Sequence, residues 1–383
     1  MKRFVKTLGA TTIVWLLSVA WAVGQAGEQK PQMAEEVFKN VQVLKGVPVD
    51  QFMSTMGFFS AALGMNCTDC HVDESGGNWA RYADDNTRKQ TARRMMLMVS
   101  AINRTNFGGR QVVTCNTCHR GDRRPNVMPS LALLYGTPPP DEPGEPFEQA
   151  PGQPSADRVI DKYIQAVGGA ERLAGIGSVV AKGSYRGFDD QAKSALEVFA
   201  KAPGQRTTIV HTLSGDSTTT YDGRAGWIAA PETEKPVPLL AITGQDLDGV
   251  KLEAELTFPA RIKQALTRWR VGAPATIGDR EARTVQGTTA GGATATLCFD
   301  SESGLLVRLV RFSESPVGRI VTQIDYADYR EVSGVKMPFR WTVSWLNGRS
   351  TFELSDVQAN LPIDAAKFAR PPVGPRPGPR PGQ

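Results

Sequence analysis

Cys67-Thr-Asp-Cys-His71 and Cys115-Asn-Thr-Cys-His119 are two copies of one pattern, C-x-x-C-H. Together they use four of the five cysteines and two of the three histidines in 383 residues, so chance placement explains them poorly. Two cysteines at this spacing can bond the two vinyl groups of one haem, and the histidine after them can ligate its iron. The sequence therefore predicts two covalently bound c-type haems. The predicted haem-bonding thiols are Cys67, Cys70, Cys115 and Cys118, and the predicted histidine ligands are His71 and His119.

Zinc binding and thiol redox chemistry are the two alternatives for such cysteine pairs. A zinc site built from both pairs would need one histidine or none, whereas here a histidine follows each pair. The gap from Cys70 to Cys115 also exceeds the usual spacing of zinc knuckles. A thioredoxin-like pair would lie near a βαβ pattern, and no such pattern is visible around either copy. Both alternatives are therefore disfavoured.

The number of histidines restricts the sixth iron ligand. His211 is the third histidine, so at most one haem can have two histidine ligands. Methionine or an open position must serve the other iron. Methionines precede each copy of the pattern: Met53, Met56 and Met65 before the first, and Met95, Met96 and Met98 before the second.

Both methionine groups fall on predicted helices. Apolar residues recur three or four apart over residues 49–64, and Met56 lies in the middle of this stripe. A second stripe runs from Asn86, a suitable N-cap, to about residue 103, and Met95 and Met98 share one of its faces. Methionines on such stripes often only fill a core. The neighbouring haem patterns and the shortage of histidines favour a role as ligands.

The helices and haem patterns together resemble the cytochrome c subunit of photosynthetic reaction centres. The resemblance covers about residues 34–129. The segments that carry it are Asn40-Val-Gln-Val-Leu-Lys-Gly, both haem patterns, Thr91-Ala-Arg-Arg-Met-Met-Leu-Met98 and Val113-Thr. In that family a helix carrying the axial methionine precedes each haem-binding helix, which implies that Met56 lies opposite His71. By the same rule Met95 lies opposite His119, with Met98 as the alternative. Family members in reaction centres carry four haems in two such pairs, and this chain has one pair.

The first 26 residues have the composition of a secretory signal peptide. Lys2, Arg3 and Lys6 form a basic start, an apolar run follows, and small residues stand where a signal peptidase reads. An uncleaved segment that anchors the protein to the membrane is the alternative, because the apolar run approaches the length of a membrane span. Export to the periplasm agrees with haem attachment of this kind, which takes place outside the bacterial cytoplasmic membrane.

Charge gives no support for nucleic acid as a partner. The net charge of +5 falls to +2 without the three basic residues of the signal peptide, and no basic patch with interleaved aromatic residues is present. Arginines nevertheless crowd the haem segment: Arg81, Arg88, Arg93, Arg94, Arg104, Arg110, Arg120, Arg123 and Arg124. They either pair with haem propionates, face an acidic redox partner protein, or form a solvated surface.

Proline-rich sequence divides the chain into two parts. Residues 131–155 and 372–383 are rich in proline, which predicts a linker and a disordered basic tail. Residues 156–371 open with a helix at 156–167 and continue with alternating apolar and polar residues between turns, which predicts antiparallel strands. The predicted strands are residues 178–186, 195–201, 207–213, 218–221, 226–229, 294–299, 305–312, 320–329 and 339–345, with a partly helical stretch at 252–269.

This second part resembles the LolA-like lipoprotein-sorting fold. The words that carry the resemblance are Gly168-Gly169, Asp222-Gly-Arg-Ala-Gly-Trp227, Phe299-Asp-Ser-Glu-Ser-Gly-Leu-Leu306, Asp328-Tyr-Arg-Glu-Val-Ser-Gly-Val-Lys-Met-Pro338 and Asn360-Leu-Pro-Ile-Asp364. The resemblance implies a curved antiparallel sheet partly closed over helices, around an apolar concavity that can take acyl chains. No catalytic set is visible in the sequence: His211 has no evident serine or aspartate partner, and Cys298 is expected to be a buried apolar residue.

The predicted fold class is α plus β in separate domains. A helical dihaem domain spans residues 34–130, and a LolA-like antiparallel half-barrel spans residues 156–371. The predicted function is electron transfer by an exported c-type cytochrome that docks on redox partner proteins, an electron carrier more than a catalyst. A haem enzyme of peroxidase or reductase type, and a binder of lipid or another apolar ligand with an accessory redox domain, are the alternatives. Because a linker separates the halves, a fragment ending near Ser130 is expected to keep both haems.

Overall fold

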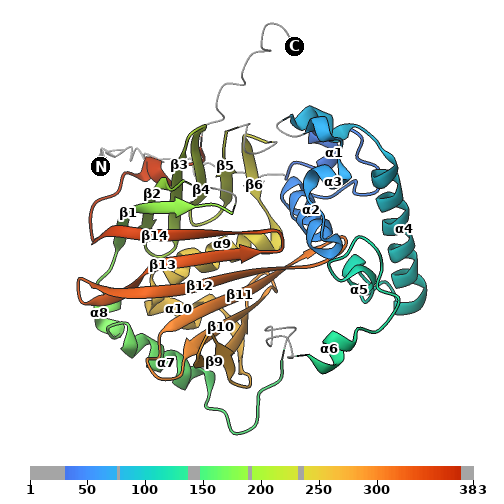
Figure 1. Ribbon diagram of the computed structural model, residues 1–383. Helices are drawn as coiled ribbons and strands as arrows, with labels where there is room; N and C mark the ends of the chain where they lie inside the picture. The colour runs from blue at the N-terminus through green and yellow to red at the C-terminus, as the bar shows by residue number, and fades with distance from the viewer. Residues whose placement is uncertain (1–30, 76–77, 137–146, 189–191, 232–236, 372–383) are drawn as a thin grey trace, which may run out of the picture. The chain divides into compact units, whose positions relative to one another are not determined.

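Figure 1 shows the computed structural model, which describes residues 31–75, 78–136, 147–188, 192–231 and 237–371. The chain divides into two compact units, Met1–Lys30 and Pro31–Gln383, and the described residues all belong to the second unit. The predicted signal peptide, the predicted tail and part of the predicted linker lie outside the described residues. None of the helices within the described ranges combines the length and the apolar character needed to cross a membrane.

Helices make up the first part of the described chain. They are α1 (Ala34–Val37), α2 (Val49–Leu63), α3 (Cys67–Cys70), α4 (Thr87–Phe107), α5 (Cys115–His119) and α6 (Leu131–Tyr135), with the 3-10 turns η1 (Asp73–Ser75) and η2 (Trp79–Ala83). α2 follows Pro48 and ends at Gly64, whose left-handed φ of 60° stops the helix. α4 follows the N-cap Asn86, whose side chain accepts a hydrogen bond from the Lys89 amide at 2.9 Å. Both predicted methionine helices are confirmed, and α4 continues for one further turn beyond its predicted end.

Strands make up most of the second part, and those in the described residues form one sheet. They are β1 (Ser178–Arg186), β2 (Ser194–Lys201), β3 (Gln205–Thr212), β4 (Gly215–Tyr221), β5 (Gly226–Ala229), β6 (Leu239–Ile242), β7 (Thr267–Val271), β8 (Ala275–Ile277), β9 (Arg280–Thr288), β10 (Thr294–Asp300), β11 (Leu306–Ser315), β12 (Gly318–Val332), β13 (Val335–Trp345) and β14 (Gly348–Ala359). The order across the sheet is β6-β5-β4-β3-β2-β1-β14-β13-β12-β11-β10-β9-β7, with β8 paired to β9. β1 pairs with β14 in antiparallel register, Val179 opposite Ala359, and so joins the two ends of the strand series.

The sheet curls around helices. The helices of this part are α7 (Ala156–Ala166), α8 (Ala170–Ala174), α9 (Gly244–Leu256) and α10 (Ile262–Ala265), with the 3-10 turns η3 (Pro259–Arg261) and η4 (Ala365–Phe368). α9 packs against β3 and also against β11, although β2, β1, β14, β13 and β12 lie between those two strands in the sheet. The sheet must therefore bend around α9, and Figure 1 shows α9 and α10 behind the long strands β11 to β13.

An apolar core lies between the curled sheet and these helices. Ile160 of α7 and Leu297 of β10 are completely buried, and the rings of Tyr163 and Phe299 lie 5.2 Å apart. Cys298 is also buried, and burial raises the pKa of its thiol to about 12. The prediction that Cys298 behaves as a buried apolar residue is confirmed.

The sequence pattern predicts nine of the strands and misses β6, β7, β8, β9 and β14. β9 escapes notice because it buries polar side chains. Its Gln286 donates from Nε2 to Thr296 Oγ1 at 3.0 Å, and its Thr284 donates from Oγ1 to the Ala273 carbonyl at 2.8 Å. Once satisfied by hydrogen bonds, such residues can stand in a core, and the apolar alternation that marks a strand is lost.

The helical part and the sheet share one small apolar cluster. Phe58 and Ala62 of α2 pack against Val317, which lies in the turn between β11 and β12, and against Ile320, which lies on β12. Partly buried neighbours of this cluster are Phe59, Met96, Cys115 and Leu346. A fragment ending near Ser130 would expose the side of α2 that this cluster buries. That such a fragment keeps both haems remains a prediction. The domain boundaries at residues 130 and 156 remain a proposal.

Candidate functional site

The first C-x-x-C-H pattern forms the short helix α3 and its C-cap. Asn66 caps the helix: its side chain accepts from the Asp69 amide at 3.0 Å, and the Asp69 side chain accepts from the Asn66 amide at 2.8 Å. Cys67 is exposed, Cys70 is half-buried, and both are free thiols. Residues three apart on a helix lie on one face, so the two thiols can meet one ligand.

His71, which follows α3, is held by one of its two ring nitrogens. Nδ1 donates to the carbonyl of Tyr82 at 3.0 Å, and Nε2 has no hydrogen-bond partner among the described residues. Burial and the charge of Lys89 lower the pKa of His71, against a smaller opposing effect of the Tyr82 hydrogen bond. A neutral imidazole whose other nitrogen donates to a backbone carbonyl is the form in which histidine ligates metals.

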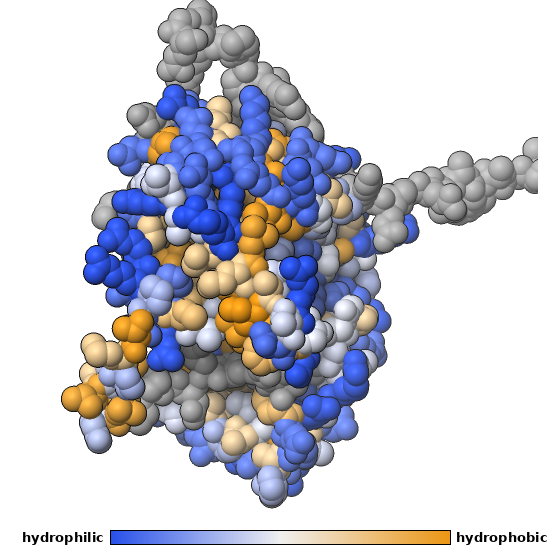
Figure 2. All heavy atoms as spheres, turned by 90° about the vertical axis from the view of Figure 1, so that its right-hand side faces the viewer, coloured by the Kyte–Doolittle hydropathy of each residue, from blue (hydrophilic) through white to orange (hydrophobic). Residues whose placement is uncertain are grey.

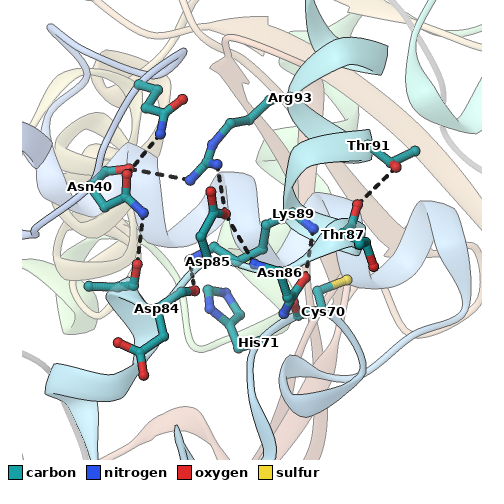
Figure 3. Close-up of polar contacts among 12 residues, drawn as sticks. Asn40, Cys70, His71, Asp84, Asp85, Asn86, Thr87, Lys89, Thr91 and Arg93 are labelled. Carbon is teal, nitrogen blue, oxygen red and sulfur yellow. Dashed lines mark hydrogen bonds and ion pairs between the residues drawn. The ribbon is translucent and has the colours of Figure 1, made fainter.

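A local hydrogen-bond network fixes this arrangement (Figure 3). Lys89 of α4 donates from Nζ to the Tyr82 carbonyl at 2.9 Å and to the Asp84 carbonyl at 2.7 Å. Asn86 donates from Nδ2 to the Cys70 carbonyl at 2.8 Å while its Oδ1 caps α4. The start of α4 therefore supports both the cysteine helix and the carbonyl that orients His71.

The second pattern forms α5 and is anchored by the far end of α4. Asn103, the buried residue of α4, donates from Nδ2 to the Val113 carbonyl at 2.8 Å, and its Oδ1 accepts from the Val113 amide at 2.9 Å. This bidentate contact fixes the chain just before α5. Cys115 is half-buried, burial raises the pKa of its thiol, and Cys118 is exposed.

His119 repeats the arrangement of the first histidine. Its Nδ1 donates to the Asp122 carbonyl at 2.9 Å, and its Nε2 has no hydrogen-bond partner in the described chain. The segment after it lies against the end of α2, where the Gly121 amide donates to the Ala62 carbonyl at 2.9 Å. Gly64 has room for no side chain here, because a Cβ would lie 2.2 Å from the Gly121 oxygen. The sequence alone predicts the histidines but not the carbonyls that orient them.

The predicted methionine ligands differ in exposure. Met56 of α2 is half-buried, whereas Met95 and Met98 of α4 are 38% and 45% exposed. Met96 packs into the apolar cluster around Phe58, so it fills a core as the alternative interpretation of these methionines expects.

α4 leaves apolar side chains without protein packing. Asn103 is its buried residue, while Met95, Leu97 and Met98 are exposed. Figure 2 looks onto this side of the molecule and shows apolar side chains exposed between hydrophilic ones. A helix that packs only on protein normally buries an apolar stripe. The free thiols, the Nε2 atoms without a hydrogen-bond partner among the described residues and the exposed apolar side chains of α4 fit a large apolar group such as a porphyrin.

His211 lies away from both patterns, on β3, and both of its nitrogens face carboxylates. Nδ1 is 2.7 Å from Asp216 Oδ1, and Nε2 is 3.6 Å from Glu197 Oε2. The expectation that His211 lacks an acidic partner is therefore wrong, because Asp216 comes opposite it only through the pairing of β3 with β4. With both nitrogens engaged, His211 is not a free iron ligand in this structure.

Within the described ranges, no group of three or more His, Cys, Asp or Glu residues is placed to hold a metal ion, either at the two C-x-x-C-H patterns or elsewhere.

The curled sheet contains an open cavity of about 950 Å³, solvent at its mouth included. Its wall is mainly apolar, with Tyr326, Trp341 and Val357 among the lining residues. Arg206 also lines it: the guanidinium lies 5.5 Å over the Trp341 ring and donates to the Glu253 carbonyl at 3.4 Å. The sequence gives no sign of this charged group, because the strands that bring it to the wall are far apart in the chain.

A family model and two curated proteins are similar to this chain. The family model of the photosynthetic reaction centre cytochrome C subunit matches residues 16–131. The photosynthetic reaction center cytochrome c subunit of Thermochromatium tepidum is 38% identical over 113 residues, which cover 28% of this chain and 26% of that protein. The subunit of the same name from Roseobacter denitrificans is 29% identical over 208 residues, covering 49% of this chain and 54% of that protein. The chain thus spans between about a quarter and about half of the length of these relatives.

The sheet has its own likeness among solved structures. A LolA superfamily protein from Nitrosomonas europaea aligns with 57% of this chain and 98% of its own, at 14% identity and a TM-score of 0.39. A DUF1329 family protein from Desulfovibrio piger aligns with 57% of this chain and 98% of its own, at 8% identity and a TM-score of 0.39. The first part of the chain is therefore similar to the reaction-centre cytochrome subunit.

Proposed function

We propose that this chain is an exported electron-transfer protein that carries two covalently bound c-type haems, one at each C-x-x-C-H pattern. The observation that carries the proposal is shared by both sites. Each histidine donates from Nδ1 to a backbone carbonyl, its Nε2 has no hydrogen-bond partner in the part of the chain that the structure describes, and the two cysteines before it are free thiols. The family match over residues 16–131 supports the same function.

Each residue has a defined role in this proposal. The thiols of Cys67, Cys70, Cys115 and Cys118 would bond the porphyrins, and His71 and His119, together with Met56 and Met95 (or Met98), would hold the two irons. The bound haems supply the redox chemistry. The carbonyls of Tyr82 and Asp122 accept a hydrogen bond from Nδ1 of each imidazole, which fixes the orientation of the ring and raises its basicity as a ligand.

The exposed arginines favour an acidic redox partner. Arg93 forms an ion pair with Asp85 at 2.8 Å, so its charge is balanced within the helical part. Others are exposed and pair with no described acidic residue: Arg104, Arg110, Arg120, Arg123 and Arg124. Charge of one sign beside a redox site speeds association with a partner of the opposite sign, and salt weakens the effect.

The test is methionine replacement followed by optical and redox titration of the full-length protein. Met56→Ala and Met95→Ala should each convert one haem from low to high spin and lower its potential, because the thioether favours reduced iron. Met96→Ala is the matched control, since Met96 lies on the same helix but packs into the Phe58 cluster. It should leave both haems low-spin.

Three other results would change the proposal. A response of Met98→Ala in place of Met95→Ala would move the second ligand to Met98. Unchanged spin states in Met56→Ala, Met95→Ala and Met98→Ala would reject methionine ligation. A high-spin haem in the unmodified protein would indicate an open iron position and favour the enzyme alternative.

The cavity in the sheet supports a second candidate function, the binding of an apolar ligand with an anionic end. Its mainly apolar wall suits an acyl chain. Arg206, which lines the cavity together with the charged residues Glu253 and Lys336, can orient a carboxylate or phosphate. Mass spectrometry of organic extracts from the purified full-length protein tests this function. Co-purified lipid in the wild type that is lost in Arg206→Ala supports it, and extracts free of lipid in both proteins argue against it.

A further inference from the structure

The sheet holds the helical part at three of its connections. Asp50 at the start of α2 accepts from the Thr243 amide and from Thr243 Oγ1, each at 2.7 Å, at the connection from β6 to α9. Gln111, just before α5, donates from Nε2 to the Ser315 carbonyl at 2.8 Å, at the end of β11. The turn after β13 brings Asn347 against Gly57, where a Cβ would lie 2.7 Å from the Asn347 oxygen.

The turn between β11 and β12 makes the closest approach to the second pattern. A Cβ on Gly318 would lie 2.7 Å from the Phe58 ring and 3.3 Å from Cγ2 of Thr114, the residue before Cys115. Gly318 also has a positive φ of 152°, which favours glycine. This turn therefore fits against α2 and the start of α5 with no space for a side chain.

Cys115 itself packs against the cluster of Phe58, Ala62, Val317 and Ile320. The first pattern has no such contact with the sheet: the hydrogen bonds of α3 and His71 within the described chain all go to residues 66–88. The two sites thus share ligand types but differ in what surrounds them.

We propose that Val317 and Ile320 form an apolar wall of the second haem site, so that the sheet tunes the haem at Cys115 and Cys118 and leaves the haem at Cys67 and Cys70 unaffected. The inference rests on the proposed function. A porphyrin bonded to Cys115 would start at a residue that packs against this cluster. Apolar surroundings that exclude water favour the reduced iron, which carries less charge. The wall residues act on the potential without touching the iron.

The test compares two isoleucines of one strand in single-haem proteins. The double replacement Cys67→Ser with Cys70→Ser leaves the second haem, and Cys115→Ser with Cys118→Ser leaves the first. Into each full-length background we introduce Ile320→Ala and, as the control, Ile324→Ala. The control removes the same atoms, but from the main core of the sheet, to which Ile324 belongs, and not from the cluster around Phe58. Midpoint potentials are measured by spectroelectrochemistry.

Ile320→Ala should lower the potential of the second haem and so reduce the ratio of reduced to oxidised haem at a fixed electrode potential. It should leave the first haem unchanged, and Ile320→Val should restore the wild-type value. Ile324→Ala should shift neither haem although it destabilises the fold. Equal shifts in both backgrounds, or the same shift from both isoleucines, would overturn the inference.

If one of the single-haem proteins fails to mature, the same measurement is made on the protein with both C-x-x-C-H patterns intact. There Ile320→Ala should move one of two potentials, and movement of both or neither would overturn the inference. Protein that attaches no haem at either pattern would overturn the proposed function instead.

Discussion

The two C-x-x-C-H patterns have the same ligand chemistry but are supported in different ways. The first is held by side chains near it in the chain, above all by Asn86 and Lys89 at the start of α4. The second is held by Asn103 at the other end of α4 and by the sheet, through the cluster that contains Ile320. The shared pattern therefore specifies the candidate ligands of each site, whereas tertiary packing decides how strongly each site depends on the rest of the molecule.

The largest expected effect follows from the cluster that distinguishes the second site. Phe58→Ala should lower the free energy of unfolding by about 3–5 kcal/mol, because it opens a cavity between α2 and the sheet. Phe52→Ala is the control on the same helix: Phe52 is half-buried and stacks on Phe38 at 5.1 Å, within the helical part. Denaturant unfolding measures both, and the two variants should differ clearly. Equal losses would mean that the cluster does not tie the second site to the sheet.

The two asparagines of α4 offer a smaller and more local test. Asn103→Ala leaves the Val113 amide and carbonyl without their partner in a buried place and should cost about 1–3 kcal/mol. Asn86→Ala removes a helix cap at a more open position and should cost about 1 kcal/mol. Haem-region circular dichroism of single-haem proteins should change at the second site for Asn103→Ala and at the first for Asn86→Ala. Crossed effects would contradict the division of α4 between the two sites.

The smallest expected effect concerns Asp50, between α2 and the sheet. Burial raises the pKa of its carboxyl above the ordinary 3.8, against the opposing hydrogen bonds from Thr243. The folded state then holds the proton more tightly than the unfolded state, so this contribution to stability is full below pH 3.8 and is lost as pH rises through the folded pKa.

Asp50→Asn removes this titration and keeps an oxygen that can accept from Thr243. The stability of the wild type relative to Asp50→Asn should therefore fall as pH rises from 3.8. Thermal unfolding of both proteins at a series of pH values measures the difference. A relative stability that rises with pH would show that the hydrogen bonds outweigh burial at this carboxyl.

The sequence predicts most of what is local. The helix ends at Gly64 and Asn86, the candidate ligands and the antiparallel character of the second part all follow from residue patterns. The packing of Cys115 against the cluster that contains Ile320 does not, because it joins segments about two hundred residues apart in the chain and neither segment indicates the other. The same reason hides Arg206 on the cavity wall and β9, whose core residues are polar.

The central claim is most directly tested by counting haems on the denatured protein. Full-length chain matured with haem available should carry two, since thioether bonds to Cys67, Cys70, Cys115 and Cys118 survive unfolding. Intact-mass spectrometry and the pyridine haemochrome assay give the number, and peptide mapping gives the attachment sites. The account predicts one haem on each C-x-x-C-H peptide. Bound zinc, a single haem or none would contradict it.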